Sequence, residues 1–258
     1  MKKALLVFGS KSDEKVYDKI VKSLKEDNFE IEMRICSAHR TPRLLDNILE
    51  KSEFDLIIAG AGLAAHLPGV IASKIIKPVI GIPISNNYEG MDSMLSIMQM
   101  PPGIPVISTG VNGSYLTNNV KLLGTEYCKV NIIGDFEKKP VINCIEMLNR
   151  FKIKYKRSKT PDEDALNIYF FELGFFNKFD EPAFYINVPM KDDSSINDSA
   201  KVMELSDIGF WVGLNRGENA ALAAIQIINQ AGKYDDEFND FRKEMQDKIK
   251  EQDKELNV

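Results

Sequence analysis

The chain has 258 residues, of which 44% are hydrophobic and 28% charged, and its formal net charge at pH 7 is −5. A chain of this length forms one large domain or two smaller ones, and the composition is ordinary for a globular protein. The negative charge gives no general attraction to nucleic acid or to an acidic membrane, so neither is expected as a partner. Cys36, Cys128 and Cys144 have no metal-ligand spacing, which predicts reduced thiols in a cytoplasmic protein.

Strand-like and helix-like patterns alternate through the first half. The apolar runs, each suited to one buried strand, are residues 3–9, 29–36, 54–60, 77–83 and 104–110. The helical patterns between them are residues 14–28, 43–51 and 91–100. This rhythm predicts an α/β fold with a parallel sheet and helices on both faces. The first run is too short for a signal peptide, and no segment approaches the roughly 18 apolar residues of a membrane span.

The same order of patterns begins again near residue 126. Residues 129–169 repeat strand, turn, helix and strand, and Thr160-Pro161 predicts a further helix, as Thr41-Pro42 does in the first half. Farther on, the alignment matches Pro189 with Pro83, Asp198 with Asp92 and Asn215 with Asn112. Any two α/β halves look broadly alike, but ordered matches at turn residues favour an internal duplication.

The predicted domains are therefore residues 1–125 and 126–258. The second copy lacks a counterpart of AGAGLAAHLPG, residues 59–69. At its end, residues 234–256 form a charged helical pattern that we expect to pack on a neighbouring element. The apolar stripe of this pattern is Phe238, Phe241, Met245 and Ile249.

The motif GSKSD, residues 9–13, follows the first predicted strand and opens a helix. Backbone amides at a helix start, with the hydroxyls of Ser10 and Ser12, suit an anionic group, and Asp13 suits sugar hydroxyls. The alternative is a simple N-cap, because Ser and Asp are favoured there for their effect on free amides.

The motif SAHRTP, residues 37–42, follows the second strand. Arg40 can make a bidentate contact with phosphate, and His39 can change its protonation near neutral pH. The alternative is a surface turn that ends at Pro42, with His39 merely solvated.

The motif AGAGLAAHLPG follows the third strand and contains the other histidine of the chain, His66. Its small residues allow a ligand to approach closely and would line a narrow, dry pocket that suits a small uncharged molecule or a carboxylate. The alternative is tight helix packing, with His66 a core histidine.

Other kinds of site are poorly supported. Two histidines without nearby carboxylates in ligand spacing argue against a metal site, and GAGLAAH is not a dinucleotide fingerprint. Cys36 has no evident orienting partner, so a buried strand-end cysteine is favoured over a thiol nucleophile.

Taken together, GSKSD, SAHRTP, AGAGLAAHLPG, PVIGIP and GMDSMLSIMQMPPGIPV closely resemble the family of N5-carboxyaminoimidazole ribonucleotide mutase and phosphoribosylaminoimidazole carboxylase, over about residues 3–123. The resemblance implies a flavodoxin-like three-layer α/β fold, here in tandem, and a role in purine biosynthesis. The implied reaction moves a carboxylate from the exocyclic nitrogen to C4 of the aminoimidazole ring through enclosed CO2. It implies no metal, nucleotide or organic cofactor.

The resemblance also implies a role for each motif. His39 would be the general acid/base, and His66 would orient the carboxylate or relay a proton. The 5′-phosphate would bind at SAHR and GSKSD, and the ribose at Asp13. The residues implied for phosphate and the adjoining wall are Ser10, Ser12, Ser37, Ala38 and Arg40. The residues implied for the CO2 and carboxylate pocket are Gly62, Leu63, Ala64, Ala65, His66 and Leu67.

The second copy departs from these motifs. GSKSD becomes GDFEK at 134–138 and SAHRTP becomes RSKTP at 157–161, so only Ser158 and Lys159 retain phosphate-binding character. Without a histidine this half is predicted to be non-catalytic and architectural. Family members form octamers, which implies a tetramer of tandem chains whose sites borrow Asn215, Asn219 or the last helix. Two alternatives remain open: direct carboxylation of aminoimidazole ribonucleotide by CO2, and an inactive nucleotide-binding scaffold.

Overall fold

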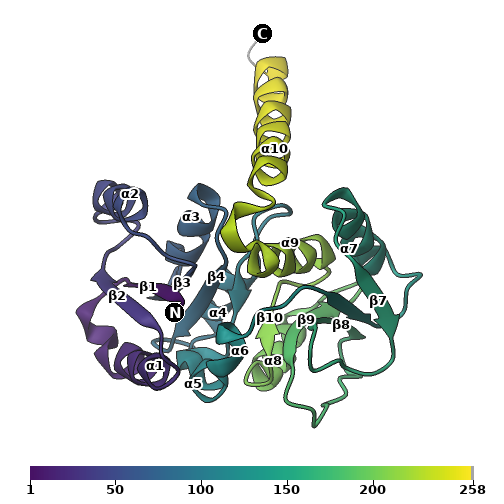
Figure 1. The fold of residues 1–258 in the computed structure, drawn as a ribbon, viewed down its shortest axis with the longest axis horizontal. Helices are drawn as coiled ribbons and strands as arrows, with labels where there is room; N and C mark the ends of the chain where they lie inside the picture. Colours follow the sequence, from purple (N-terminus) through teal and green to yellow (C-terminus); the bar gives the residue numbers. More distant parts are fainter. Residues whose placement is uncertain (257–258) are drawn as a thin grey trace.

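The structure is a computed structural model that describes residues 1–256, with only the backbone described for residue 230. One ten-stranded sheet runs through the whole molecule, with helices on both faces (Figure 1). The fold class predicted from the sequence is therefore correct. Among the helices of these residues, none combines the length and the apolar character that a membrane crossing needs.

The elements of the first half include every predicted strand and helix, together with three helices that were not predicted, at residues 67–74, 114–119 and 121–124. They are β1 (Lys3–Phe8), η1 (Lys11–Asp13), α1 (Glu14–Glu26), β2 (Glu30–Ile35), α2 (Pro42–Lys51), β3 (Leu56–Gly62), α3 (Leu67–Lys74), β4 (Val79–Ile84), α4 (Met91–Met98), β5 (Ile107–Ser108), η2 (Val111–Gly113), α5 (Ser114–Asn119) and α6 (Lys121–Gly124). The elements of the second half are β6 (Val130–Ile133), α7 (Lys139–Arg150), β7 (Tyr155–Ser158), β8 (Leu166–Glu172), β9 (Phe184–Met190), α8 (Ile196–Leu205), β10 (Phe210–Trp211), α9 (Gly217–Ile228), η3 (Gln230–Gly232) and α10 (Asp235–Leu256).

The strand order repeats in the two halves. It reads β2-β1-β3-β4-β5 and then β10-β9-β8-β6-β7, so each half has the flavodoxin-like order 2-1-3-4-5 when its strands are numbered from its own start. Pairing within each half is parallel, whereas β5 and β10 meet antiparallel at Ser108 and Trp211. The halves are thus related by an approximate two-fold rotation about an axis perpendicular to the sheet.

A pair of asparagines marks this relation at the residue level. Asn112 accepts the backbone N–H of Ser85, just after β4, at 3.0 Å, and Asn215 accepts that of Lys191, just after β9, at 3.1 Å. Both asparagines have φ of 60°, in the left-handed region that Asn tolerates better than most residues. The predicted match between them is confirmed.

One face of the sheet has a core that continues across both halves. The side chains of β1 after Lys3 are buried, as expected of a parallel strand covered on both sides. Helix α1 buries Tyr17, Ile20 and Leu24, spaced three and four residues apart, on one stripe. Buried apolar side chains of α5, α6, α7 and α9 belong to the same core.

The other face is complete only in the first half, where α2, α3 and α4 cover it. The helix predicted after Thr160-Pro161 is wrong, because residues 161–165 are a loop and no helix lies between β7 and β8. Two buried asparagines hold this loop in place of a helix. Asn131 donates to Thr160 O at 3.0 Å, and Asn167 donates to Asp162 O at 2.9 Å, so their amides satisfy the loop's backbone.

No helix lies between β8 and β9 either, and aromatic side chains cover the sheet there. Phe171 packs edge-on against Phe176, with ring centroids 4.9 Å apart, and Phe176 stacks on Trp211 at 5.9 Å. In the first half, the corresponding connection, between β3 and β4, contains α3 instead. This difference agrees with the missing counterpart of residues 59–69.

The last helix, α10, joins the halves at its base and then projects from the body (Figure 1). Phe238 and Phe241 pack on Phe151, the C-cap residue of α7, and their ring centroids lie 4.7 and 6.4 Å from that of Phe151. Ile249, on the same stripe, is 65% exposed. The predicted packing is therefore correct for the first turns of the helix only.

Candidate active site

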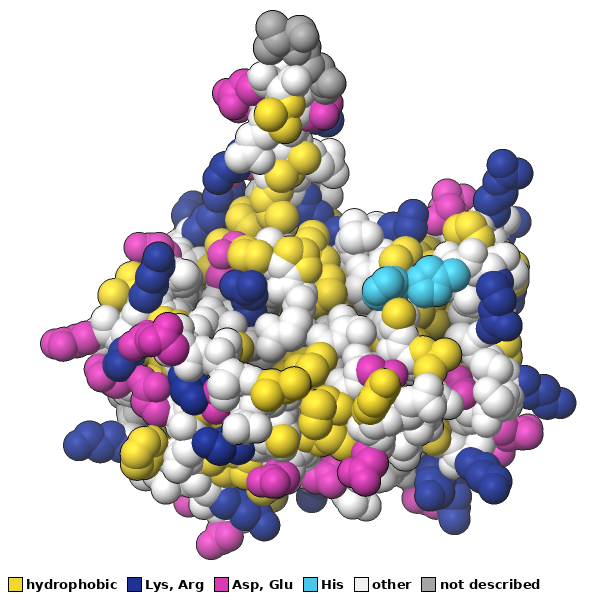
Figure 2. All heavy atoms as spheres, turned by 180° about the vertical axis from the view of Figure 1, so that it is seen from behind, with side chains coloured by type: hydrophobic (Ala, Val, Ile, Leu, Met, Phe, Trp, Pro, Cys, Tyr) yellow, Lys and Arg dark blue, Asp and Glu magenta, His cyan; other side chains and the backbone are white. Residues whose placement is uncertain are grey.

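The three small-residue motifs meet at the carboxyl ends of β1, β2 and β3. Together they enclose a cavity of about 460 Å³. Figure 2 shows the two histidines side by side on this surface. The residues that line the cavity are Gly9, Ser10, Ser12, Asp13, Ser37, Ala38, His39, Arg40, Ala61, Gly62, Leu63, Ala64, His66, Leu67 and Asn86.

The GSKSD loop is organised by its own hydroxyls. Ser10 caps η1, since its side chain accepts the N–H of Ser12 at 3.2 Å. The Ser12 hydroxyl lies 2.8 Å from that of Ser10 and 3.0 Å from Oδ1 of Asp13. Burial raises the pKa of Asp13, and the hydrogen bond from Ser12 opposes this rise. The N-cap interpretation is correct for Ser10, and the same loop still faces the cavity.

The SAHRTP loop is a closed turn tied to the first loop. Thr41 donates its N–H to Ser37 O at 2.9 Å, and its hydroxyl accepts the N–H of Ser37 at 3.0 Å. Arg40 donates from Nη2 to Gly9 O at 2.8 Å, which fixes one edge of the guanidinium. Cys36 is buried beside Thr41, with Sγ 3.4 Å from Oγ1, in agreement with the strand-end prediction.

The two histidines form a direct pair. Nε2 of His39 lies 2.9 Å from Nδ1 of His66, and the rings meet edge to face with centroids 5.0 Å apart. One of these nitrogens must carry a proton and the other must lack it, so the two rings share one proton in this hydrogen bond. His66 is exposed, so the core-histidine interpretation is wrong, and His39 is more than a solvated turn residue.

The Gly-Ala loop forms the narrow wall of the cavity. Leu63 adopts φ of 58° and is 53% exposed at the loop's tip. Ala65, which was expected in this wall, is not among the residues that line the cavity; it is 1% exposed and packs in the core beneath the loop with Leu67 and Ile71.

Asn86 was missed by the sequence reasoning. Its side chain lies against Gly62, where an added Cβ would come within 2.0 Å of Nδ2. The signal for it was available, since Asn86 follows β4 just as the other motifs follow their strands.

The corresponding edge of the second half also has a cavity, of about 390 Å³. Ser158 and Lys159 line it, but the bulky side chains of Phe171 and Phe175 stand beside them. Lys138 also lines this cavity, but its Nζ lies 2.9 Å from the carboxylate of Glu172. This cation of the cavity is therefore already paired.

Neither asparagine suggested as a contributor from the second half lines the histidine cavity. Asn215 donates to Lys191 O at 2.6 Å, and Asn219 binds the loop between α4 and β5.

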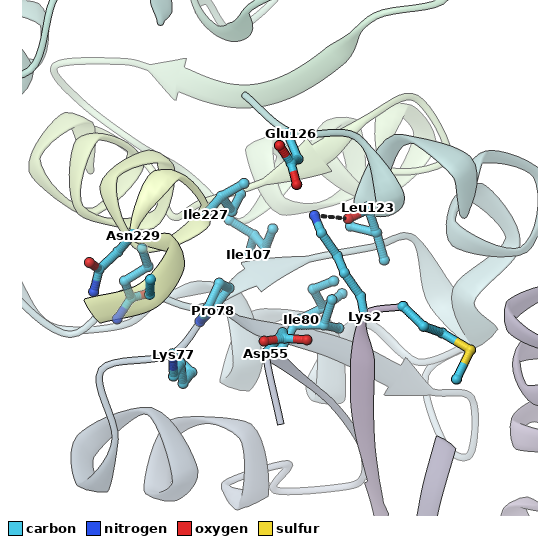
Figure 3. A pocket seen from close by; sticks show the side chains of 14 residues that line it. Lys2, Asp55, Lys77, Pro78, Ile80, Ile107, Leu123, Glu126, Ile227 and Asn229 are labelled. Atoms are coloured by element: carbon cyan, nitrogen blue, oxygen red, sulfur yellow. Dashed lines mark hydrogen bonds between the residues drawn. The ribbon is translucent and has the colours of Figure 1, made fainter. Parts of the chain in front are cut away.

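A further cavity, of about 350 Å³, lies between the halves at the amino ends of β3 and β4 (Figure 3). Lys2 points into it and donates to Leu123 O at 2.7 Å, near the carboxylates of Asp55 and Glu126. The histidines follow the opposite ends of the strands, so this cavity is separate from the candidate site.

Comparisons with known proteins agree with the motifs. The family model described as AIR carboxylase matches residues 3–131. The chain is 51% identical to N5-carboxyaminoimidazole ribonucleotide mutase of Methanocaldococcus jannaschii over 107 residues, which cover 42% of this chain and 68% of the relative. It is 45% identical to the protein of that name from Pyrococcus abyssi over 134 residues, which cover 50% and 75%.

A solved structure is also similar over part of the chain. The crystal structure of Treponema denticola PurE has 28% sequence identity and a TM-score of 0.39, and the match covers 43% of this chain and 72% of that one.

Proposed function

The chain belongs to the AIR carboxylase family, and we propose that it is an N5-carboxyaminoimidazole ribonucleotide mutase, an isomerase of purine biosynthesis. The observation that carries the proposal is the contact of His39 with His66, at 2.9 Å, in a cavity walled by glycine and alanine. Linked imidazoles can deliver one proton and take up another, as an isomerisation with no net proton change requires.

In the proposed reaction, His39 begins protonated. The bond between the exocyclic nitrogen and the carboxylate breaks, its electron pair stays on nitrogen, and nitrogen takes the proton of His39 as CO2 is released. C4 of the ring then attacks CO2, and the C4 proton returns to His39. His66, which shares a proton with His39, holds the carboxylate or relays the proton.

The other cavity residues bind the nucleotide. Ser12, Ser37 and Arg40 hold the 5′-phosphate, because hydroxyls and a guanidinium make strong bonds to phosphate oxygens. Asp13 accepts hydrogen bonds from the ribose hydroxyls. The small side chains around Gly62 and Ala64 leave space for CO2 and little for water, which keeps CO2 near C4.

The first experiment supplies the purified protein with the carbamate nucleotide, or with aminoimidazole ribonucleotide and bicarbonate, and follows the carboxylated product by absorbance. Turnover of the carbamate alone supports the mutase. Turnover only from aminoimidazole ribonucleotide would make the protein a carboxylase, and no turnover of either would favour the nucleotide-binding scaffold.

A variant assigns the proton step to His39. We expect His39→Asn to lower kcat by about 10²–10⁴-fold, the usual contribution of a positioned acid/base group, while the nucleotide still binds. Arg43→Ala is the control, since Arg43 is exposed on α2 and does not line the cavity. Undiminished turnover by His39→Asn would remove His39 from the mechanism.

We also propose that residues 1–125 and 126–258 are tandem copies, that the second is non-catalytic, and that the protein is a cytoplasmic tetramer resembling an octamer. The repeated strand order supports the duplication. A monomeric mass by light scattering would contradict the tetramer.

A further inference from the structure

The position of His66 depends on helix α3. His66 is the N-cap of this helix, and its C=O accepts the N–H of Val70 at 2.9 Å. A shift of α3 therefore moves His66 with it, while His39 stays on the loop after β2. Misplacement of a reacting group by about 1 Å can cost about 10²-fold in rate, so a catalytic pair of this kind needs α3 to be held.

The second half contacts the carboxyl end of α3 directly. Arg242 of α10 donates from Nη2 to Ala72 O at 2.8 Å and from Nη1 to Ser73 O at 3.0 Å. Carbonyls in the last turn of a helix lack partners within the helix, and a cation there is favoured by the helix dipole. Arg242, a side chain of the second half, thus caps the carboxyl end of α3, the helix whose N-cap is His66.

A second contact reaches α3 through the loop of residues 99–106. Asn219, at the start of α9 and 1% exposed, accepts the N–H of Gly103 at 2.8 Å and donates to Pro101 O at 3.0 Å. Met100 of this loop packs on Gly69 of α3, where an added Cβ would lie 3.0 Å from Sδ. Asn219 therefore fixes the loop that supports the first turns of α3.

We infer that the second half, although it has no histidine, positions His66 for catalysis through Asn219 and Arg242. Both act through α3 and are positioning residues, not catalytic ones. The kinetic part of this inference rests on the proposed function. Its structural part, the position of His66 relative to His39, does not.

The geometry predicts an unequal effect on the kinetic constants. The proposed phosphate and ribose contacts come from the loops after β1 and β2, whereas α3 follows β3. Loosening α3 should disturb the histidine pair and leave nucleotide binding largely intact. A contact that only joined the halves would instead lower the amount of folded protein, with no selective effect on kcat.

The test compares Asn219→Ala and Arg242→Met with the matched control Asn215→Gly. Asn215 also binds one backbone N–H and one backbone C=O, but both belong to Lys191 of the second half. Glycine suits the positive φ at this position. We expect kcat to fall about tenfold or more in the two test variants, with KM within about twofold of wild type, and both constants to be unchanged in the control.

A second readout does not need turnover. The chain has only two histidines, so ¹³C-labelled histidine gives NMR signals that belong to the pair alone. We expect Asn219→Ala and Arg242→Met to shift these signals, and Asn215→Gly to leave them unchanged. If the wild-type protein turns over neither the carbamate nucleotide nor aminoimidazole ribonucleotide, the proposed function fails. The NMR signals still show whether Asn219 and Arg242 position His66.

Two results would overturn the inference. One is an unchanged histidine signal in both test variants. The other is an equal change in all three variants, which would indicate general loosening. Met100→Ala completes the test, because combining it with Asn219→Ala should cost less than the sum of the single effects if Asn219 acts through Met100.

Discussion

At the residue scale, Asp13 shows a conflict between stability and function. Burial raises its pKa, so its charged form is less favourable in the folded protein than in the unfolded chain. The folded state therefore binds protons more readily, and the free energy of unfolding falls as pH rises through the pKa of Asp13. The ribose contact proposed for Asp13 needs the charged carboxylate, which is the form that burial disfavours.

We predict that Asp13→Asn raises the melting temperature at pH 7 by about 1–3 °C and lowers kcat/KM. The amide removes the buried charge, but it is a poorer acceptor for ribose hydroxyls. Thermal denaturation at pH 7 and pH 4 measures the first effect, and the gain should shrink at pH 4, where more of the native carboxyl is protonated. An equal gain at both pH values would contradict the explanation.

The contact between the two histidines could not be predicted from the sequence. Each imidazole could be placed on a loop after its strand, because polar residues at the carboxyl ends of parallel strands mark ligand sites. In the sheet, however, β1 lies between β2 and β3. The loops carrying His39 and His66 therefore meet across the end of β1, and a distance of 2.9 Å depends on how both loops close, which local pattern does not specify.

At the scale of elements, the interactions that stabilise the N-terminus of α8 depend on pH. Ser195 and Asp198 form a capping box, and Nζ of Lys191 lies 2.7 Å from the Asp198 carboxylate. The ammonium of Lys191, followed by the hydrogen bonds from Ser195, holds the pKa of Asp198 well below its usual range. Since the folded pKa is lowered, this carboxylate stabilises the protein above the unfolded pKa, near 4, and the stabilisation is lost as pH falls toward the folded value.

We predict that Asp198→Asn lowers the free energy of unfolding at pH 7 and that the difference from wild type narrows below about pH 4. Urea unfolding of both proteins at pH 7 and pH 3 measures it. Asp193→Asn is the control, since Asp193 is exposed in the preceding turn and is outside the capping box. A difference that stays constant from pH 7 to pH 3 would argue against a role for the charge.

In the first half, α1, α2 and α4 could be predicted, whereas α3, α5 and α6 were missed. The absence of helices between β7 and β8 and between β8 and β9 could not be predicted either. Periodic apolar residues mark α1 and α2, and residue types favoured at N-caps, Asp13 and Thr41, precede them. Thr160-Pro161 carries the same start signal, yet only residues 161–165 precede β8. Asn131 and Asn167 decide the outcome by binding the loop, and this depends on strand pairing that is distant in sequence.

At the scale of the whole molecule, the two halves share one sheet and one continuous core. Side chains from α1 and α7, in different halves, belong to the same cluster of buried residues. Asn219 and Arg242 add polar contacts between the halves. Unfolding of one half would expose the core of the other, so the halves should not unfold independently.

We predict a single calorimetric transition in which the calorimetric and van't Hoff enthalpies agree for the cooperative unit. Scanning calorimetry of the full chain at several protein concentrations measures this and reveals any contribution from assembly. Two resolved transitions, assigned to the halves by the near-ultraviolet signal of Trp211 in the second, would show that the shared core does not couple them.

The antiparallel meeting of β5 and β10 has a consequence for how such a chain can change over generations. In a symmetric pair of separate identical subunits, every residue occurs at two places, so a change that helps one place is imposed on the other. Covalent linkage of two such units ends this constraint. Under the proposed duplication, the loop after β6 could lose its phosphate motif, and the start of α9 and helix α10 could specialise in support, because neither change touches the loops that carry His39 and His66.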